Sequence, residues 1–549
     1  GGGGGGDSLD IRKLTLGTIA SGVEEKDEPR IEAPAHNTYH PGSDDALPYN
    51  DDASVVCPPH TTQRKIVTRI DFHLMPFLII LYLLAFLDRV NIANARSFHL
   101  SEDLGLSTVQ YSTALTIFFV PYVFFEVPSN ILLKKFTPQD LISAPSRSEK
   151  SPANPHCTLS GCVIWFGCMS IFQGLVQNYA GLLATRFVED PRLWLEARLI
   201  ACRFFLGLFE TGMFPGCFYL LSMWYRRDEA QKRYSLFFSS TSLAGAFGGL
   251  LASAIGKMDG IRGYHGWRWI FILEGTLTAL VGMVFLFTFP SFPEQAMWLQ
   301  EDEREYVKAR LRADQGHNAV ERKISLRDVG AVLKDYRVIL GGLMYFGLIV
   351  PAYGYAFFAP TIIATYKYNA IQTQLRSVPP WAASFVFSLV IAAISDRFKH
   401  RYLFTLIPML LSFAGFGILL NVHDNLDLQY GALFLVVMGI YGSMPITVCW
   451  FNMNLAGHHR RSIGTAWQIG FGNIGGIIAT YAFDDPPYFK KGYSIGVAFT
   501  ALSAASCAAY LAAIMVENKR RAKAVRNVGL SEYEKGELGD LNPEFRYMY

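Results

Sequence analysis

Long apolar segments are the feature that most constrains how this chain can fold. A bilayer core about 30 Å thick requires about 20 mostly apolar residues in one helix. The sequence of 549 residues contains twelve segments of this kind. Their approximate limits are 70–96, 109–133, 162–178, 199–225, 236–257, 267–290, 338–364, 378–395, 403–421, 430–453, 463–482 and 493–516. We therefore predict an all-α membrane protein with twelve transmembrane helices.

A charged stretch between the sixth and seventh segments divides them into two groups of six. The chain also begins with a polar, acidic stretch rich in Gly and Pro, a composition typical of a disordered tail. The predicted parts are a cytosolic N-terminal tail at 1–63, an N-terminal six-helix bundle at 64–290, a cytosolic central loop at 291–337, a C-terminal six-helix bundle at 338–516 and a cytosolic C-terminal tail at 517–549.

Composition excludes several classes of protein. Hydrophobic residues make up 51% of the chain and charged residues 17%, which is too apolar for an ordinary soluble multidomain protein. A net charge of +3 does not suggest nucleic-acid binding. The eight cysteines show no paired metal-ligand spacing, and no nucleophile–base set or phosphate loop is recognisable. We expect no metal, no cofactor and no enzymatic activity.

The orientation in the membrane follows from where Lys and Arg collect. Clusters of these residues occur before the first segment, in alternate connections, in the central loop and after the last segment. Cytosolic connections carry the excess of Lys and Arg in membrane proteins. We therefore expect both termini and the central loop to be cytosolic, in a multi-pass protein of the plasma membrane.

Four charged residues stand out inside predicted membrane helices. Asp88 and Arg89 occur in "LLAFLDRVNIANA", and Arg203 and Glu210 occur in "RFFLGLFE". A spacing of seven places Arg203 and Glu210 on nearly the same helix face, whereas the adjacent Asp88 and Arg89 do not face each other. An arginine can bind a carboxylate through two hydrogen bonds, and a buried carboxyl group can carry a proton. The pattern indicates proton-coupled anion uptake, although ion pairs between helices are the structural alternative.

Three further polar residues leave two interpretations open. Glu126 could relay protons, or it could bond either a donor freed by Pro128 or the side chain of Lys134. The stretch "GFGNIGG" formally matches a dinucleotide-binding pattern but lies inside an apolar segment, so Gly472 and Gly476 are better explained by close helix packing. The neighbouring amides of Gln468 and Asn473 could either bond an adjacent helix or orient a polar ligand.

Aromatic residues near the ends of other segments are expected to anchor helices at the membrane interface. This interpretation is preferred for Trp450 and for Tyr353 and Tyr355, with ligand contact as the alternative. Pro351 precedes these tyrosines and Gly354 lies between them, which indicates a helix that can bend during gating.

The order and spacing of seven segments resemble the major facilitator superfamily. More narrowly, the chain is similar to the anion:cation symporter family, in its fungal allantoate, nicotinate and pantothenate permease branch. The matching segments are "LLAFLDRVNIANA", "YVFFEVPSNILLKKF", "RFFLGLFETGMFPG", "GWRWIFILEG", "SVPPWAASFV", "AISDRFKHR" and "IGFGNIGGIIA". The resemblance implies two six-helix bundles around a central site that opens alternately to each side of the membrane.

The resemblance also implies roles for individual residues. Arg89 and Arg203 would bind a substrate carboxylate, while Asp88 and Glu210 would carry or gate a proton. Further substrate contacts are expected from Tyr122, Asn473 and Gln468, and Glu126 is a further candidate for proton coupling. A cytosolic gate motif survives in part as Ala392, Asp396, Arg397 and Arg401.

Two stretches depart from the family pattern. Residues 139–161 are polar and rich in Ser and Pro, and residues 188–202 interrupt a helix that is continuous in the family. Translated introns or gene-model errors are one explanation. Alternatively, Asp190 and Pro191 start the helix anew, about three turns before Arg203. Arg186 is then expected in an outer loop.

The leading interpretation is a proton-coupled symporter of a small carboxylate, such as nicotinate or a related vitamin acid, that works by alternating access. The expected partners are a small organic anion, protons and membrane lipid, and the protein is expected to be a monomer. A non-transporting nutrient sensor on the same scaffold is one alternative, and a product inactivated by the two inserts is another.

Overall fold

The computed structural model consists of helices and their connections. It describes residues 57–135, 155–175, 191–288, 293, 296, 298–315, 326–398, 400–455, 458–524 and 545–549. Within these ranges, every regular element is a helix.

Seven long or medium-length helices make up the first half of the described chain. They are α2 (Gln63–Arg96), α4 (Thr108–Lys135), α6 (Pro155–Gly174), α7 (Pro191–Glu210), α8 (Met213–Trp224), α9 (Arg227–Ile255) and α10 (Gly266–Thr288). The short helices α3 (Leu100–Asp103), η2 (Gly256–Met258) and η3 (Ile261–Gly263) lie in connections between them.

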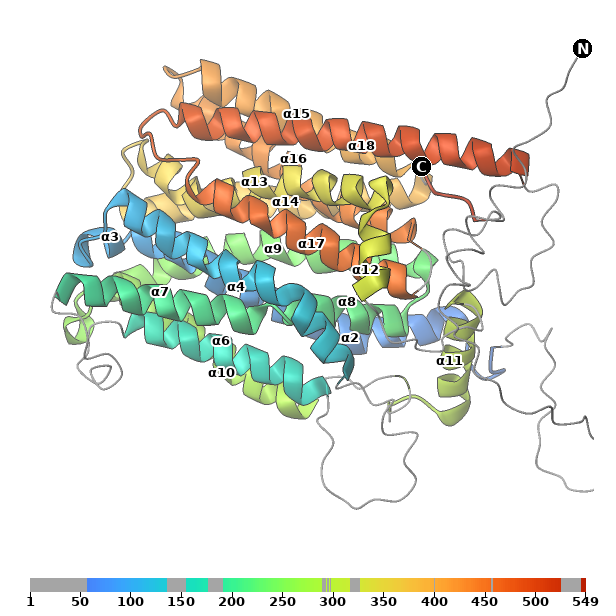
Figure 1. Ribbon diagram of the computed structural model, residues 1–549. Helices are drawn as coiled ribbons and strands as arrows, with labels where there is room; N and C mark the ends of the chain where they lie inside the picture. Colours follow the sequence, from blue (N-terminus) through green and yellow to red (C-terminus); the bar gives the residue numbers. More distant parts are fainter. Residues whose placement is uncertain are drawn as a thin grey trace, which may run out of the picture. The chain divides into compact units, whose positions relative to one another are not determined.

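Six long helices make up the second half. They are α13 (Tyr336–Ala364), α14 (Ala370–Phe398), α15 (Arg401–Asn421), α16 (Leu426–Met453), α17 (His458–Thr480) and α18 (Lys490–Ala524). Between the halves, α11 (Glu301–Gln315) and α12 (Leu326–Leu333) lie in the segment predicted as a central loop. Figure 1 shows α15 and α18 on one side of the helical array and α6 and α10 on the other.

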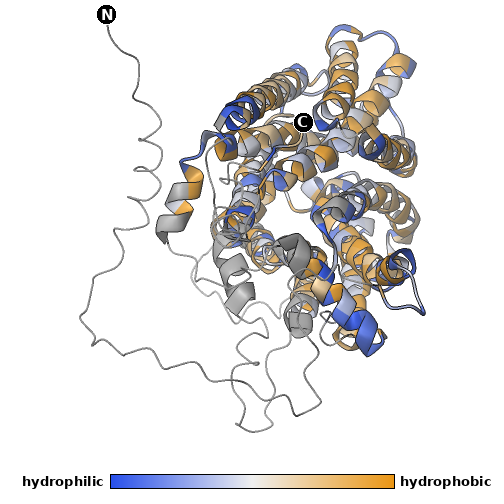
Figure 2. Ribbon diagram, turned by 90° about the vertical axis from the view of Figure 1, so that its right-hand side faces the viewer, coloured by the Kyte–Doolittle hydropathy of each residue, from blue (hydrophilic) through white to orange (hydrophobic). Residues whose placement is uncertain are grey.

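Each predicted membrane segment overlaps one helix, except that the fourth segment overlaps both α7 and α8, which are separated by residues 211–212. Nine helices of the described part are long and apolar enough to cross a membrane. The described apolar part of α6 is shorter, α8 has only 12 residues, and α7 and α17 carry charged residues in their first turns. In Figure 2, hydrophobic residues run along the helices and hydrophilic residues gather at their ends.

Helix α7 begins at Pro191 and continues without interruption to Glu210. Proline suits the first position of a helix because its φ is already helical and its missing N–H needs no partner there. Residues 191–202 are part of the helix that carries Arg203, which agrees with a helix start at Asp190 and Pro191. Residues 139–154 and Arg186 lie outside the described part.

Close helix packing depends on glycine at a few positions. A Cβ atom at Gly472 would lie 2.2 Å from Cδ1 of Tyr345 on α13, and one at Gly476 would lie 2.3 Å from Cε1 of Phe119 on α4. Both distances are too short for a real contact, so any larger residue would push the helices apart. The packing role predicted for these glycines is confirmed, and it places α17 against both α13 and α4.

Contacts between the two halves are made mainly by α9 with α14 and by α4 with α17. On α9, Ser242 is hydrogen-bonded to Ser384 of α14 over 3.2 Å. On α4, Thr116 is hydrogen-bonded to Thr480 of α17 over 2.7 Å. Helices α2 and α13 also contact each other, and the candidate site residues described below lie between them.

The segment 545–549 packs against the helices of the second half. Asn518 of α18 donates to the carbonyl oxygen of Tyr547 and accepts from its amide, each over 2.9 Å. Asn454 likewise donates to the carbonyl oxygen of Met548 over 3.0 Å and accepts from its amide over 2.7 Å. The hydroxyl of Tyr547 accepts from Arg337 of α13 and from Arg521 of α18. Residues 545–549 of the predicted tail therefore hold the ends of several helices together. The first part of that tail is helical, because α18 extends to Ala524.

Replacing Asn518 with alanine is expected to lower the melting temperature of the purified protein. The change leaves the buried amide and carbonyl of Tyr547 without their partner, at a cost of about 1–3 kcal/mol. A thiol-reactive dye that labels Cys449 and Cys507, both buried, would follow unfolding in detergent. Lys519→Ala, at an exposed position of the same helix, is the control. Equal melting temperatures for the two variants would contradict a tying role for this segment.

A second group of polar contacts joins the first turns of α13 and α17. The carboxylate of Asp335 accepts from Arg337 over 2.7 Å and from Arg460 of α17 over 2.6 Å. Burial opposes the charged form of Asp335, but the hydrogen bonds and charges of these two arginines outweigh it and hold the pKa of the carboxyl group below its usual value. Asp335 also accepts from the backbone N–H of Arg337 and so caps α13.

This lowered pKa predicts how Asp335→Asn depends on pH. A carboxyl group whose pKa is lower in the folded state stabilises the protein fully above its unfolded pKa of about 3.9, and that stability is lost as the pH falls through the folded value. The variant should be less stable than the parent by about 2 kcal/mol at neutral pH. The difference in unfolding free energy should shrink in strongly acidic buffer. Asp427→Asn, at an exposed acid, should show no such trend, and a pH-independent difference for Asp335→Asn would refute the assignment.

Candidate functional site

Arg89 lies at the centre of the described helices and is only 3% exposed. Its guanidinium group donates to the carboxylate of Glu210 on α7 and to the hydroxyl of Tyr353 on α13. The guanidinium carbon also lies 4.9 Å from the ring centroid of Phe118 and 5.2 Å from that of Tyr122, both on α4. Aromatic faces attract a cation at such distances, so a single buried cation organises α2, α4, α7 and α13.

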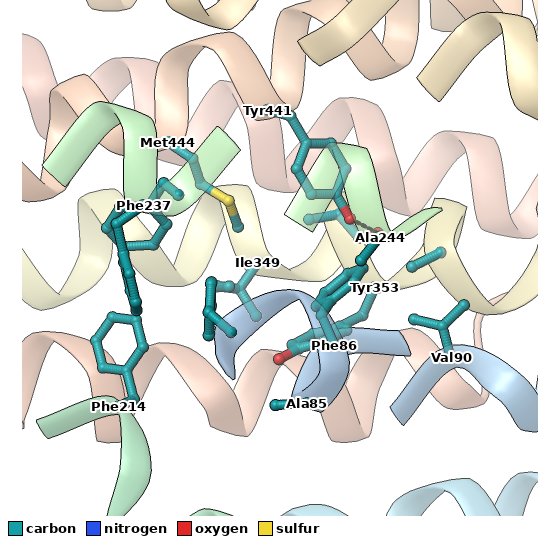
Figure 3. Packing of buried hydrophobic residues seen from close by; sticks show 14 of the residues in the cluster. Ala85, Phe86, Val90, Phe214, Phe237, Ala244, Ile349, Tyr353, Tyr441 and Met444 are labelled. Atoms are coloured by element: carbon teal, nitrogen blue, oxygen red, sulfur yellow. Dashed lines mark hydrogen bonds between the residues drawn. The ribbon is translucent and has the colours of Figure 1, made fainter. Parts of the chain in front are cut away.

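Tyr353 extends this network into the second half of the chain. Its hydroxyl donates to Oδ1 of Asn473 on α17 over 3.3 Å. Figure 3 shows Tyr353 in the packed core close to Phe86 of α2, with Tyr441 of α16 nearby. A continuous series of hydrogen bonds therefore runs from Glu210 through Arg89 and Tyr353 to Asn473, and it joins helices of the first half to helices of the second.

Arg203 and Glu210 both reach toward α2 from the same face of α7, as their spacing predicts. Glu210 contacts the side chain of Arg89, whereas Nη1 of Arg203 donates to the backbone oxygen of Arg89 over 3.2 Å. Within the described part, Nε and Nη2 of Arg203 make no hydrogen bond. This guanidinium is 1% exposed. Its two unused nitrogen atoms can therefore donate to a further acceptor next to the Arg89 network.

Asp88 points away from Arg89, as expected for adjacent helix positions. Its Oδ1 accepts from the hydroxyl of Ser170 on α6 over 3.0 Å. Arg203 acts on Asp88 electrostatically. Asp88 therefore faces α6 in the first half of the chain, whereas Arg89 contacts Tyr353 in the second half.

Three other predicted residues differ in how closely they approach this network. The ring of Tyr122 faces Arg89 directly. Glu126, one turn further along α4, acts electrostatically on Arg89 and lies against α17, where a Cβ atom at Gly470 would be 3.2 Å from its Oε2. Gln468 instead donates to the backbone oxygen of Gly341 on α13 over 3.2 Å. Of the two interpretations for Gln468, the geometry favours a bond between helices.

The predicted gate residues lie where α14 ends and α15 begins. Nη1 of Arg401 is 2.7 Å from Oδ1 of Asp396 and donates to the hydroxyl of Ser395 over 3.0 Å. Arg397 is exposed. The surviving part of the motif therefore forms one ion pair, between Asp396 and Arg401, that links two consecutive helices of the second half.

Sequence reasoning missed the central position of Tyr353. The residue was assigned to interface anchoring because aromatic residues commonly gather at membrane surfaces. The available signal was its place between Pro351 and Gly354, in the middle of a 29-residue helix rather than near its end. Phe118 was also missed, since a phenylalanine in an apolar helix carries no local mark of contact with a cation.

Within the described ranges, no group of three or more His, Cys, Asp or Glu residues is placed to hold a metal ion. A buried guanidinium that joins two groups of membrane helices marks a functional-site candidate of the kind that membrane transporters carry. The family model of the Major Facilitator Superfamily matches residues 78–480. The chain belongs to this superfamily.

Similar proteins come from fungi. The chain is 29% identical over 505 residues to the high-affinity nicotinic acid transporter of Saccharomyces cerevisiae, covering 91% of this chain and 87% of that protein. It is 30% identical over 510 residues to the MFS-type transporter cnsO of Penicillium expansum, covering 89% of this chain and 91% of that one. These relatives confirm the resemblance to the superfamily and to its fungal nicotinate permease branch, and they are named transporters rather than enzymes.

Solved structures agree on the fold. The chain superposes on the partially occluded, inward-open xylose transporter XylE from E. coli with a TM-score of 0.56 at 15% identity, covering 79% of this chain and 97% of that one. For a bacterial homologue of the lysosomal transporter Spinster the TM-score is 0.55 at 13% identity, with 82% and 97% covered. The predicted fold of twelve membrane helices in two six-helix bundles is confirmed.

Proposed function

We propose that this protein is a secondary active transporter that takes up a small organic carboxylate, such as nicotinate, together with protons. The observation that carries the proposal is the buried guanidinium of Arg89, which contacts Glu210 of one bundle and Tyr353 of the other. An arginine in this position suits a carboxylate ligand. The similarity to a nicotinic acid transporter supports the choice of nicotinate as the first substrate to test.

The coupling follows from competition for one cation. Glu210 and a substrate carboxylate would both bind the guanidinium of Arg89, so an ionised Glu210 opposes substrate binding. Protonation of Glu210 removes its charge and releases Arg89 for the substrate. Binding of a proton and binding of an anion therefore favour each other, as reciprocal linkage requires. Loss of the proton to the cytosol would restore the Arg89–Glu210 pair and expel the substrate.

The other predicted residues take supporting roles in this proposal. Arg203 would supply a second cation through its unused donors, and Tyr122 and Asn473 would contact the bound substrate. Asp88 and Glu126 would pass protons toward Glu210. The ion pair of Asp396 and Arg401 would close the cytosolic side, in a monomer of the plasma membrane with both termini in the cytosol. We propose that no cofactor takes part.

Uptake of labelled nicotinate into cells that express the full chain tests this function. We expect saturable accumulation that a protonophore abolishes, because the proton gradient supplies the driving force. Accumulation that persists with the protonophore would exclude proton coupling. A non-transporting sensor on the same scaffold would bind nicotinate without accumulating it, and a product inactivated by its inserts would do neither.

A further inference from the structure

A further buried carboxylate lies outside the hydrogen-bond network around Arg89. Glu274 belongs to the stretch "FILEG" on α10 and is 2% exposed. The residue after it is glycine, and a Cβ atom there would lie 2.8 Å from the backbone oxygen of Gly167 on α6. The close approach of α6 at Gly275 therefore encloses Glu274 among helices of the N-terminal bundle. An ionisable group in such a position is costly unless it has a partner or a function.

Glu274 is held by α2. Nδ2 of Asn91 donates to its Oε2 over 2.6 Å, and Asn94 donates to Oδ1 of Asn91 over 3.4 Å. The other oxygen, Oε1, has no hydrogen-bond partner among the residues that the structure describes. The carboxyl group is thus positioned by one firm hydrogen bond and retains an oxygen that can accept a proton.

Asp88 lies on the same side of α2 as Asn91, three positions earlier. Thr278, one turn after Glu274 on α10, interacts with Asp88. Helices α2 and α10 therefore contact each other at two positions about one helical turn apart. Asn91 contacts Glu274 at one position, and Asp88 interacts with Thr278 at the other. This arrangement brings two buried carboxyl groups into one compartment.

Few charged side chains lie on the helices that pack around Glu274. Asp88 of α2 acts on it electrostatically. The described side chains of α6 include no charged residue, and those of α9 that carry charge lie in its first two turns. Lys257 of η2 is exposed, and Arg268 of α10 binds the backbone oxygen of Gly174. Arg203 acts on Asp88 and so connects this compartment to the substrate site.

We propose that Glu274 is a proton-binding residue of the transport cycle whose protonation is coupled to that of Asp88, with Asn91 as its positioning residue. Two carboxyl groups buried together cannot both ionise cheaply, so the pair keeps a proton when one group is charged. The carboxylate gains a proton from the outer side and gives it up to the cytosolic side. This inference rests on the proposed function and adds a proton site distinct from Glu210.

Glu274→Gln separates this role from a structural one. Glutamine still offers Asn91 an oxygen acceptor of the same shape, but it cannot bind or release a proton. In proteoliposomes with labelled nicotinate, we expect accumulation driven by an inward proton gradient to fall by about tenfold or more, because the proton site is lost. Counterflow, which exchanges substrate without net proton movement, should stay within about twofold. Glu303→Gln, which changes a buried carboxylate bound to Arg69 near the cytosolic end of α2, is the matched control.

Retention of gradient-driven accumulation in Glu274→Gln would overturn the proposal. Loss of counterflow together with accumulation, in a protein that still folds, would also overturn it and would assign Glu274 to substrate binding or packing. If the parent protein itself does not accumulate nicotinate under a gradient, the proposed function fails instead.

Infrared spectroscopy decides the role of Glu274 without any substrate. Spectra of the purified protein at different pH values should contain a carboxylic acid C=O band that titrates. This band should be absent in Glu274→Gln and unchanged in Glu303→Gln. An identical titrating band in the parent protein and in Glu274→Gln would show that Glu274 does not exchange a proton.

Discussion

Replacing Arg89 with lysine is expected to abolish saturable uptake of nicotinate, with a loss of at least about a hundredfold in transport efficiency. The guanidinium contacts Glu210 and Tyr353 at the same time while facing the rings of Phe118 and Tyr122. Lysine keeps the charge but has neither the planar fork nor the flat face that these contacts use. Uptake by cells, normalised to the amount of protein at the surface, measures the effect.

The same substitution at Arg64 provides the control for Arg89→Lys. Arg64 is exposed in the first turn of α2, so its replacement should leave uptake unchanged. Melting temperatures of both purified variants would identify a loss caused only by unfolding. Near-normal uptake by a folded Arg89→Lys protein would show that the substrate carboxylate binds elsewhere.

Replacing Glu210 with glutamine is expected to strengthen nicotinate binding and to remove its dependence on pH. The change removes the negative charge that competes with the substrate for Arg89. Because a hydrogen bond to a charged group contributes about 1.5–3 kcal/mol, the dissociation constant should fall by about tenfold or more at neutral pH. Accumulation driven by a proton gradient should be lost, since the amide cannot be protonated. Binding of labelled nicotinate to the purified protein measures the first effect, and uptake by proteoliposomes measures the second.

Glu102→Gln, at an exposed position of the connection after α2, is the control for Glu210→Gln and should match the parent in both assays. Weaker binding in Glu210→Gln would contradict the competition mechanism, because it would mean that Glu210 assists the substrate. The expected gain in affinity also distinguishes Glu210 from Glu274, whose replacement should leave nicotinate affinity almost unchanged.

Some parts of the site could be predicted because their signal is local. A charged residue within an apolar segment stands out at once, which identified Asp88, Arg89, Arg203 and Glu210. A spacing of seven along a helix also placed Arg203 and Glu210 on one face. By contrast, Gln468 carried the same polar signal as Asn473, but Gln468 binds the backbone of α13 whereas Asn473 binds Tyr353.

The sequence by itself determined the approximate positions of the membrane helices, their superfamily and several of the charged residues buried among them. These properties depend on composition within about 20 consecutive residues, because a helix satisfies its own backbone hydrogen bonds within the bilayer. Glu274, which lies in the predicted segment 267–290, was not singled out. Only the tertiary structure decided that Arg89 binds Glu210 and Tyr353, and that Glu274 faces Asn91. Partner choice depends on how each helix is rotated and how deeply it lies against its neighbours. Packing among residues distant in the sequence sets that geometry.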